Sequence, residues 1–198
     1  MAASGYGAAL GLKRMSVIHE SMSVHNTMVL KCVNALAPGY TYSTRVGDSV
    51  YGEYLRVSVR VMNNTGNTNP SSTRLFVLLD RQPNGVQPAD TDIFQWALNT
   101  GYASLSDILF TARQRFTLLW DELVGFSSDY GGNSVGEDKP AFYVVKIPLN
   151  KLQTTYAGVA GTYADITTNT LWFGHICYNA TGTQLQVDLV ADYCYWDR

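Results

Sequence analysis

The chain is poor in charge, and this scarcity narrows what it can do. Only 15% of its 198 residues are charged, and its formal net charge is −2, whereas soluble domains average about 25% charged residues. A chain without net positive charge does not attract polyanions through its overall field. Because 46% of the residues are hydrophobic and 12% are aromatic, the composition indicates either an ordinary β-sandwich with a polar, uncharged surface or a surface that other protein covers.

Cysteine is also scarce, and long apolar runs are lacking. Cys32, Cys177 and Cys194 are the three cysteines, an odd and sparse set that argues against a secreted disulfide scaffold and favours buried free thiols in a reducing compartment. No apolar run reaches the length of about 18 residues that a transmembrane helix needs, so we expect no membrane partner. Residues 1–16 have no charged region ahead of an apolar core and do not resemble a secretory signal.

Enzyme motifs are lacking as well. His19, His25 and His175 are far apart and form neither an H-x-H pair nor an H-E-x-x-H motif, so a metal-dependent jelly-roll enzyme has little support. Residues 125–128, GFSS, lack the second glycine of a nucleophile elbow. Cys177 shares a strand face with His175, which suits neighbouring core side chains better than a Cys–His nucleophile. We therefore predict no catalytic residue, no metal site and no cofactor.

What is present is a series of strand-length patterns separated by polar turns. Residues 74–85, RLFVLLDRQPNG, hold a continuous apolar run and end in a Pro-Asn-Gly turn. Both faces of such a strand must be covered, one by the core and the other by something else. Residues 49–64 instead alternate, with Val59 among the inward residues and with Arg56 and Arg60 on the opposite face. The dense turn cluster at 63–70 predicts a hairpin between these two strands.

The whole pattern predicts an all-β fold. Two short helices, capped by Thr91 and Ser104, are expected in the long connection at 87–112, and no βαβ rhythm occurs. The fold class is therefore an eight-stranded antiparallel jelly-roll sandwich with short helical insertions in loops. Residues 1–25 are expected to be a short, loosely docked N-terminal arm, and residues 26–198 a single domain. The expected strands are 26–35, 49–64, 74–79, 114–126, 142–149, 163–166, 170–179 and 184–196.

Three strings in a fixed order resemble a known family. LRVSVRVMNNT at 55–65, RLFVLLDRQPNG at 74–85 and RQRFTLLWDE at 113–122 are similar to segments of the capsid (coat) proteins of small circular Rep-encoding single-stranded DNA viruses. Those coats look in turn like the single jelly rolls of plant satellite virus and tombusvirus-like capsids. The family usually opens with a long basic arm, whereas only Lys13 and Arg14 precede the first expected strand here.

The resemblance implies a structural protein and its partners. Many copies would assemble into a small icosahedral shell around a nucleic-acid genome, with single-stranded DNA as the expected genome. The location would be the virion and, during assembly, the host cell interior, with the nucleus as one compartment to test. Loop carboxylates such as Asp121 and Asp129 could supply calcium between subunits, although their spacing matches no EF-hand.

Two groups of residues are candidates for these contacts. Arg56 and Arg60 could touch phosphate, or they could be solvated or paired with Glu53 or Asp80. Aromatic residues in loop or helical stretches could form subunit interfaces, or they could cap the ends of the sandwich. The candidates for nucleic-acid binding are Lys13, Arg14, Lys31, Arg56 and Arg60. The candidates for subunit contacts are Tyr102, Phe110, Phe126, Tyr130, Tyr156 and Tyr163.

A function of another class stays open. Lectin-like β-sandwiches also place Tyr, Trp and Asn in their loops, so a glycan-binding module is the alternative to a capsid subunit. The two differ in the size expected in solution, because a capsid subunit forms uniform particles and a lectin remains a monomer or small oligomer.

Overall fold

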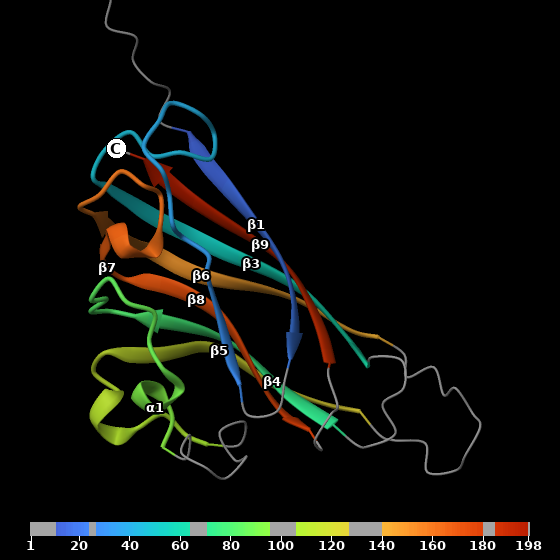
Figure 1. The fold of residues 1–198 in the computed structure, drawn as a ribbon. Coiled ribbons are helices and arrows are strands. Elements are labelled where there is room, and N and C mark those ends of the chain that lie inside the picture. Colours follow the sequence, from blue (N-terminus) through green and yellow to red (C-terminus); the bar gives the residue numbers. More distant parts are fainter. Residues whose placement is uncertain are drawn as a thin grey trace, which may run out of the picture.

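Two antiparallel sheets form the body of the molecule (Figure 1). The computed structural model describes residues 11–23, 27–63, 71–95, 106–126, 140–179 and 185–197. Sheet A has the strand order β1-β9-β3-β6-β7 and sheet B has the order β2-β8-β4-β5. The strands are β1 (Leu12–Ser23), β2 (Met28–Cys32), β3 (Ser49–Asn63), β4 (Ser71–Asp80), β5 (Phe116–Phe126), β6 (Ala141–Tyr156), β7 (Ile166–Thr168), β8 (Thr170–Asn179) and β9 (Leu185–Asp197).

The pairing of the strands defines the fold class. β1 pairs with β9, β2 with β8, β3 with β6 and β4 with β5, all antiparallel. The first four strands therefore pair with the later ones in nested, reverse order, and they alternate between the two sheets. This arrangement is a jelly roll, so the predicted fold class is confirmed. The short β7 adds to the edge of sheet A beside β6.

The expected N-terminal arm is wrong for residues 12–23. These residues form β1, which pairs with β9 along its whole length. Met15 and Val17 pack against the core, whereas Ile18 is 72% exposed. An apolar residue on the outer face blurs the alternation that identifies a strand, and this is why the sequence pattern missed β1. Residues 1–10 and 24–26 lie outside the described residues.

Two further expectations need correction. The hairpin expected between residues 49–64 and the strand that begins near Arg74 is wrong, because β3 lies in sheet A and β4 in sheet B. The helix expected after Ser104 is also wrong over residues 106–109, where Ile108 forms an antiparallel bridge with Phe94. The first helix is a single turn, α1 (Asp90–Ile93), and 3-10 turns follow at η2 (Phe110–Ala112) and η3 (Tyr163–Asp165).

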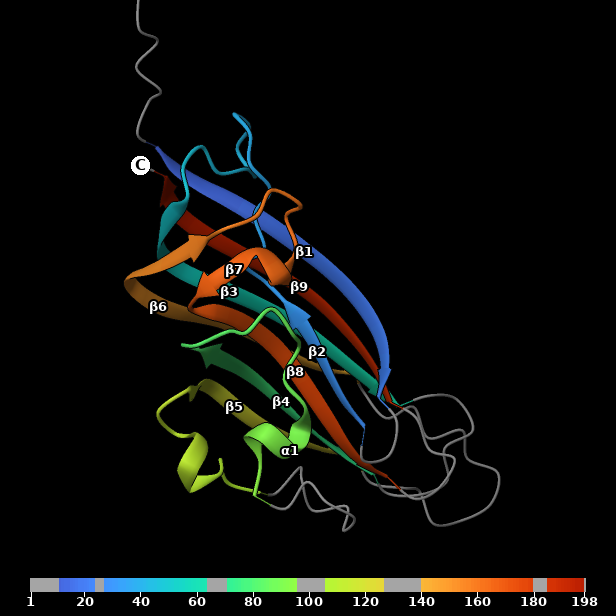
Figure 2. The ribbon, with the colours of Figure 1, turned by 60° about the vertical axis from the view of Figure 1, so that its left-hand side comes forward.

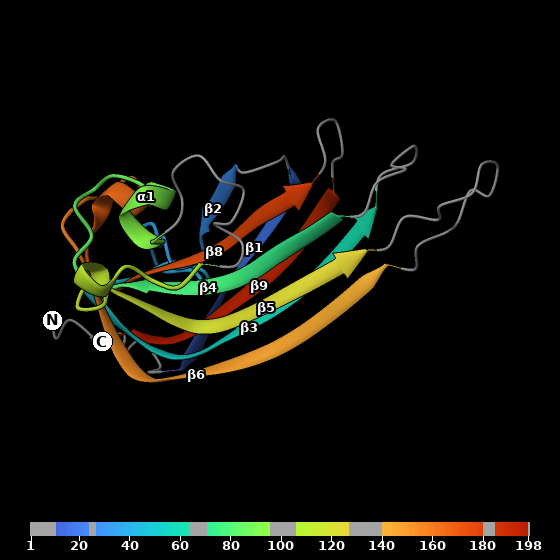
Figure 3. The same ribbon diagram turned by 90° about the horizontal axis from the view of Figure 1, so that it is seen from below.

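Strand β4 is covered on both faces, as its apolar run predicts. Leu75, Val77 and Leu79 lie in the main core between the sheets. Phe76 and Leu78 lie in a second cluster that includes two residues of the α1 segment. Figure 2 shows this segment over β4 and β8 on the side of sheet B that faces away from sheet A, and Figure 3 places it where β4 ends and β8 begins. The chain therefore closes the outer side of sheet B with its own insertion.

Close packing around β4 requires a glycine on the neighbouring strand. Gly174 of β8 pairs with Phe76, and a Cβ at this position would lie 2.3 Å from the Cζ atom of the Phe76 ring. A side chain there would displace the ring from the second cluster. The edge of the same ring meets Phe94 of the covering segment at 5.4 Å between centroids, which is a favourable aromatic geometry.

Two of the three cysteines are buried, as the sequence predicts. Cys177 and Cys194 are buried, whereas Cys32 is only partly buried. Burial raises the pKa of the partly buried Cys32 thiol to about 12, so this thiol stays protonated. Within the described ranges, no helix has the length and apolar character to span a membrane.

We predict that Val59→Asp prevents folding. Val59 is 3% exposed in the main core, and an unpaired buried charge costs several kcal/mol, comparable with a total stability of about 5–15 kcal/mol. Ser58→Asp, one residue away on the outer face, is the matched control and should melt close to the wild type. Circular dichroism and thermal melting of both variants measure this. A soluble Val59→Asp protein with a normal melting temperature would contradict the assignment of this face to the core.

Candidate nucleic-acid and subunit surfaces

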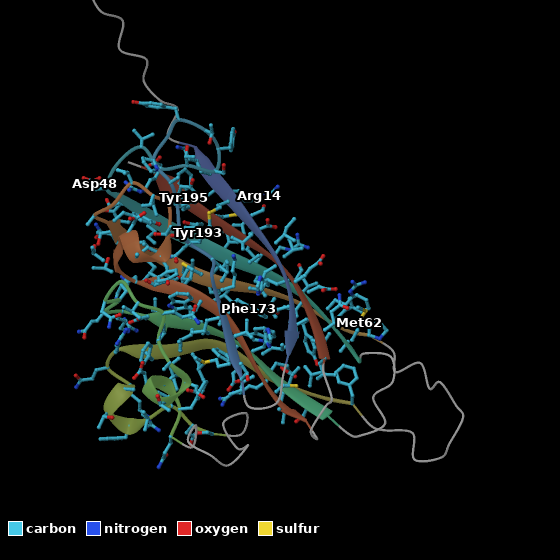
Figure 4. The ribbon with its side chains drawn as sticks, viewed as in Figure 1. Arg14, Asp48, Met62, Phe173, Tyr193 and Tyr195 are labelled. Atoms are coloured by element: carbon cyan, nitrogen blue, oxygen red, sulfur yellow. The ribbon has the colours of Figure 1, made fainter. Side chains whose placement is uncertain are left out.

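The outer face of sheet A is a broad surface that no other part of the described chain covers. Side chains on neighbouring strands form rows across it, because the strand registers align Glu20, Asp188, Arg60 and Phe142 in one row and Ile18, Val190, Ser58 and Val144 in the next. Figure 4 marks its two ends with Arg14 on β1 and Met62 on β3. The inner side of the same sheet is core, where the rings of Tyr193 and Tyr195 stack with their centroids 5.3 Å apart.

Three of the predicted nucleic-acid-binding residues lie on this face, and each is close to a carboxylate. Arg60 Nε donates a hydrogen bond of 2.8 Å to Asp188 Oδ2. Arg14 and Arg56 flank Asp192 at 3.9 and 4.0 Å. The arginines are thus paired, but with aspartates of β9 rather than with the suggested Glu53 and Asp80. Their side chains are 46–63% exposed, so each pair adds little stability.

The electrostatics of Asp188 reflect these contacts. Burial alone would raise the pKa of its carboxyl, but hydrogen bonds from Gln186 and Arg60, together with the Arg60 charge, lower the pKa below its ordinary value. Asp188 is therefore ionised at neutral pH and holds Arg60 in place. A phosphate that approached Arg60 would meet this carboxylate as well.

The other two basic candidates lie elsewhere. The Lys13 ammonium is 2.7 Å from Asp197 Oδ2 and donates to the Thr44 carbonyl at 3.0 Å. Its side chain is 16% exposed, so Lys13 joins β1 to the end of β9 and to a loop rather than facing an external partner. Lys31 is half-buried on β2 in sheet B. The structure therefore does not bring the five residues into one site.

The aromatic interface candidates divide into exposed and buried groups. Phe110 is 81% exposed and Tyr163 is 37% exposed, and both remain available for contacts. Phe126 and Tyr156 are 8% and 4% exposed members of the main core, so their assignment to an interface is wrong. The alternative that they cap the sandwich fits, because a buried aromatic side chain gains more from the core than from solvent. Tyr102 and Tyr130 lie outside the described residues.

Contacts explain why Tyr156 is held inside. Its hydroxyl donates a 2.8 Å hydrogen bond to the Asn34 carbonyl, and the Arg45 guanidinium lies 4.6 Å from its ring centroid. Burial, followed by the neighbouring Tyr193, raises the pKa of this hydroxyl far above its usual range. Tyr156 therefore stays neutral and links the end of β6 to the loop after β2.

The sequence analysis did not predict an apolar patch that the structure exposes on sheet A. Ile18, Phe142, Val144 and Val190 project from the outer face of sheet A, with exposed fractions of 72%, 69%, 65% and 43%. The available signal was the strand at 142–149, which reads as apolar on both faces. Loop residues add further exposed rings, since Tyr40 and Tyr42 are 91% and 79% exposed. Apolar exposure thus occurs both on the outer face of sheet A and on a loop at one end of the sandwich.

A polar contact joins β1, at the edge of sheet A, to β8 of sheet B. Ser21 Oγ of β1 and His175 Nε2 of β8 are 2.8 Å apart. Burial, helped by the charge of His19, lowers the pKa of His175 to about 4, and burial, followed by the Lys31 charge, lowers the pKa of His19. His175 is completely buried, so substrate cannot reach this Ser–His pair. The contact serves to hold β1 against sheet B.

Possible metal ligands do not gather within the described ranges. There, no group of three or more His, Cys, Asp or Glu side chains could hold a metal ion. Asp121, a suggested calcium ligand, instead accepts two hydrogen bonds of 2.6 Å from Arg74. Asp129 lies outside the described residues.

Comparisons with solved structures return structures of viruses, at low similarity. No protein-family model matches the chain, and no curated protein matches its sequence. Among solved structures, the Triatoma virus empty capsid is 10% identical with a TM-score of 0.40, over 93% of this chain and 87% of that one. Mud crab tombus-like virus is 13% identical with a TM-score of 0.38, over 95% and 92%. Desmodium yellow mottle tymovirus is 11% identical with a TM-score of 0.31, over 93% and 88%. Identities of 10–13% and TM-scores of 0.31–0.40 do not assign a function to the chain.

We predict that the stability of the protein falls as the pH drops from about 6.5 to about 4. The unfolded chain carries a histidine with an ordinary pKa near 6.5, whereas folded His175 has a pKa of about 4. Between these values the unfolded state binds more protons, so the free energy of unfolding decreases with falling pH, by an amount on the order of 3 kcal/mol.

His175→Gln tests this linkage, because a glutamine side chain can still form a hydrogen bond with Ser21 but does not titrate. Urea denaturation at pH 7.5, 6, 5 and 4.5 should show a flatter dependence of stability on pH than in the wild type. His19→Gln is the matched control and should remove a smaller part of the slope, since the His19 ring is only partly buried. An unchanged slope in His175→Gln would show that other groups cause the acid sensitivity.

Proposed function

We propose that this chain is the subunit of a viral capsid, which self-assembles into a small closed shell around a single-stranded nucleic acid. The observation that carries the proposal is the exposure of large apolar side chains on two parts of a closed jelly roll, the outer face of sheet A and the loops at one end of the sandwich (Figure 3). Phe110 projects from the η2 turn, Tyr40 and Tyr42 from the loop before β3, and Val159 from the loop after β6, with exposed fractions of 81%, 91%, 79% and 78%. A shell subunit meets neighbours on several sides, whereas a glycan-binding module needs one site.

The small number of charges supports the same proposal. Interface cores are depleted in charged residues and enriched in aromatic ones, and the chain has 15% charged and 12% aromatic residues. The jelly-roll topology is one that viral capsid and lectin domains share, so topology alone does not choose between them. The resemblance of three ordered strings to the Rep-encoding single-stranded DNA viruses favours the capsid, DNA as the genome, the virion as the location and the host nucleus as a candidate site of assembly.

Nucleic-acid binding is the less well supported part of the proposal. The exposed arginines of sheet A are adjacent to aspartates, and Lys13 is used inside the fold. Packaging would then depend on weak contacts repeated over many copies rather than on one strongly basic site. Such contacts are electrostatic, so binding of single-stranded DNA should weaken steeply as salt rises.

Negative-stain electron microscopy of the purified chain tests the proposal directly. Uniform closed particles, or small oligomers that convert into particles as pH and salt are varied, are the expected result. A chain that stays monomeric at high concentration under all of these conditions would overturn the capsid proposal. Retention of that monomer on a sugar resin would point to the glycan-binding alternative.

We predict that Phe110→Ser weakens particle assembly while it leaves the melting temperature nearly unchanged. Phe110 is 81% exposed, so its removal costs the folded monomer little, but an aromatic side chain at an interface often contributes about 2 kcal/mol or more. Light scattering gives the extent of assembly, and thermal melting gives the stability.

Phe126→Ser is the matched control, because Phe126 is 8% exposed in the main core. Loss of a buried Phe costs about 3–5 kcal/mol, so this variant should lose stability first. If Phe110→Ser instead lowers the melting temperature and the remaining folded protein assembles normally, Phe110 belongs to the fold and not to an interface.

A further inference from the structure

At the centre of the outer face of sheet A, the acidic and the basic side chains lie on different strands. The acidic column lies on β9, where Asp188 and Asp192 point outward, and the basic column lies on the neighbouring β3, with Arg56 and Arg60. The strands on either side carry apolar groups at the middle of the face. Ile18 on β1 and Val144 on β6 are 72% and 65% exposed there. Farther out on these two strands, the neighbouring rows end in Glu20 on β1 and in Lys146 on β6.

We propose that two copies of the chain pack sheet A against sheet A around a two-fold axis that runs parallel to the strands, between β9 and β3. Such a rotation keeps the position of each residue along the strands, and it places β9 opposite the partner's β3 and β1 opposite the partner's β6. The acidic column of each copy then faces the basic column of the other. Asp188 lies opposite the partner's Arg60, and Asp192 lies opposite the partner's Arg56, in the registers that the strands already have.

The middle row is complementary in shape as well as in charge. The same axis places Ile18 opposite the partner's Val144 and Val190 opposite the partner's Ser58. Ser58 is small, and it helps to line a shallow hollow of about 290 Å³ together with Arg60, Val144 and Val190. Val190 is 43% exposed, so each copy places a projecting valine opposite the small Ser58 of its partner. Interlocking of this kind gives face-to-face sheets their packing.

Another two-fold axis does not give this match. An axis in the plane of the face but perpendicular to the strands would leave β9 opposite β9 and β3 opposite β3. Arg56 would then approach the partner's Arg60, and Asp192 would approach the partner's Asp188, and like charges that face each other oppose association. The charged columns therefore favour the axis parallel to the strands over the axis perpendicular to them.

A polyanion fits this face less well than a second copy does. Arg60 is hydrogen-bonded to Asp188, and Arg56 is 4.0 Å from Asp192, so a phosphate chain would approach each arginine beside a carboxylate. A second copy meets opposite charges at both of these positions and apolar groups between them. For this reason we favour a second copy as the partner of this face.

The size of the face indicates a weak, reversible dimer. Four strands spaced by about 4.8 Å give a face about 19 Å wide, and the three rows from Asp188 to Asp192 extend about 14 Å along the strands. The matched area is therefore roughly 270 Å², well below the about 800 Å² per partner of a standard stable interface. The contact goes beyond the proposed shell, since it uses a sheet face and not the aromatic loops, and it can be measured on unassembled chains. Failure of the dimer would leave particle formation, which microscopy tests, as a separate question.

Charge rescue between Ile18 and Val144 tests the symmetry. Within one chain these residues are three strands apart, about 14 Å, so new charges there would interact little with each other. Across the proposed axis they face each other over a sheet separation of about 10 Å, which a glutamate and a lysine side chain can span. Ile18→Glu and Val144→Lys should each weaken dimerisation about tenfold or more, because each places an unpaired charge against an apolar group. The Ile18→Glu/Val144→Lys double variant should return to within about threefold of the wild type.

Sedimentation equilibrium over a concentration series gives the dissociation constants, and thermal melting confirms that each exposed substitution leaves the fold intact. Val86→Lys is the matched control, since Val86 is 63% exposed but lies in the loop after β4, and it should dimerise like the wild type. A wild-type chain that is purely monomeric, or a double variant as weak as the singles, would overturn the proposal. A monomer that binds a single-stranded oligonucleotide more tightly after Val144→Lys and less tightly after Ile18→Glu would assign this face to nucleic acid instead.

Discussion

Strand β4 cannot leave either face in water, and much of the chain is arranged to meet that requirement. Its inner face lies in the core between the sheets, while Phe76 and Leu78 on its outer face need a second cover. The α1 segment supplies this cover, so sheet B is closed by its own chain. Nothing comparable covers sheet A within the described residues, and the difference between the sheets leaves one open face for contacts with other molecules.

Several of the chain's few charged residues stabilise the packing around β4. Arg74 of β4 binds Asp121 of β5 at 2.6 Å, and Arg115 binds Asp80 at 2.8 Å. Asp80 is only 1% exposed, and a buried carboxylate without its partner would be strongly destabilising. Two arginines of the most family-like segments therefore act inside the fold. With Lys13 also used internally, three of the five candidate basic residues remain on the outer face of sheet A, and these three lie beside aspartates.

The sequence was informative where one periodicity dominated a segment. The strict alternation of β3 correctly placed Val59 inside and Arg60 outside, and the uninterrupted run of β4 correctly required two covers. It failed where the decisive information was non-local. Nothing local says that β4 crosses to the other sheet instead of pairing with β3, or that Tyr156 reaches the carbonyl of Asn34 across the core. Among the candidate site residues, Phe110 could be recognised as exposed. The apolar patch of sheet A could not be predicted, because the outward-facing Ile18 interrupts the alternation that would have identified β1.

The exposed apolar residues of sheet A indicate that this face contacts another molecule. Folding a single copy gains nothing from isoleucine, valine and phenylalanine on the water-facing side of sheet A, because apolar burial stabilises by about 25 cal/mol per Å² only where water is excluded. Ile18, Val144 and Phe142 are each exposed by more than half, at 72%, 65% and 69%, and they lie in rows with ordered charges rather than scattered singly. Scattered apolar residues are normal on protein surfaces, but an apolar patch rimmed by charges is typical of an interaction surface. The physical reason for this patch therefore lies outside the folded monomer, in a surface that covers it.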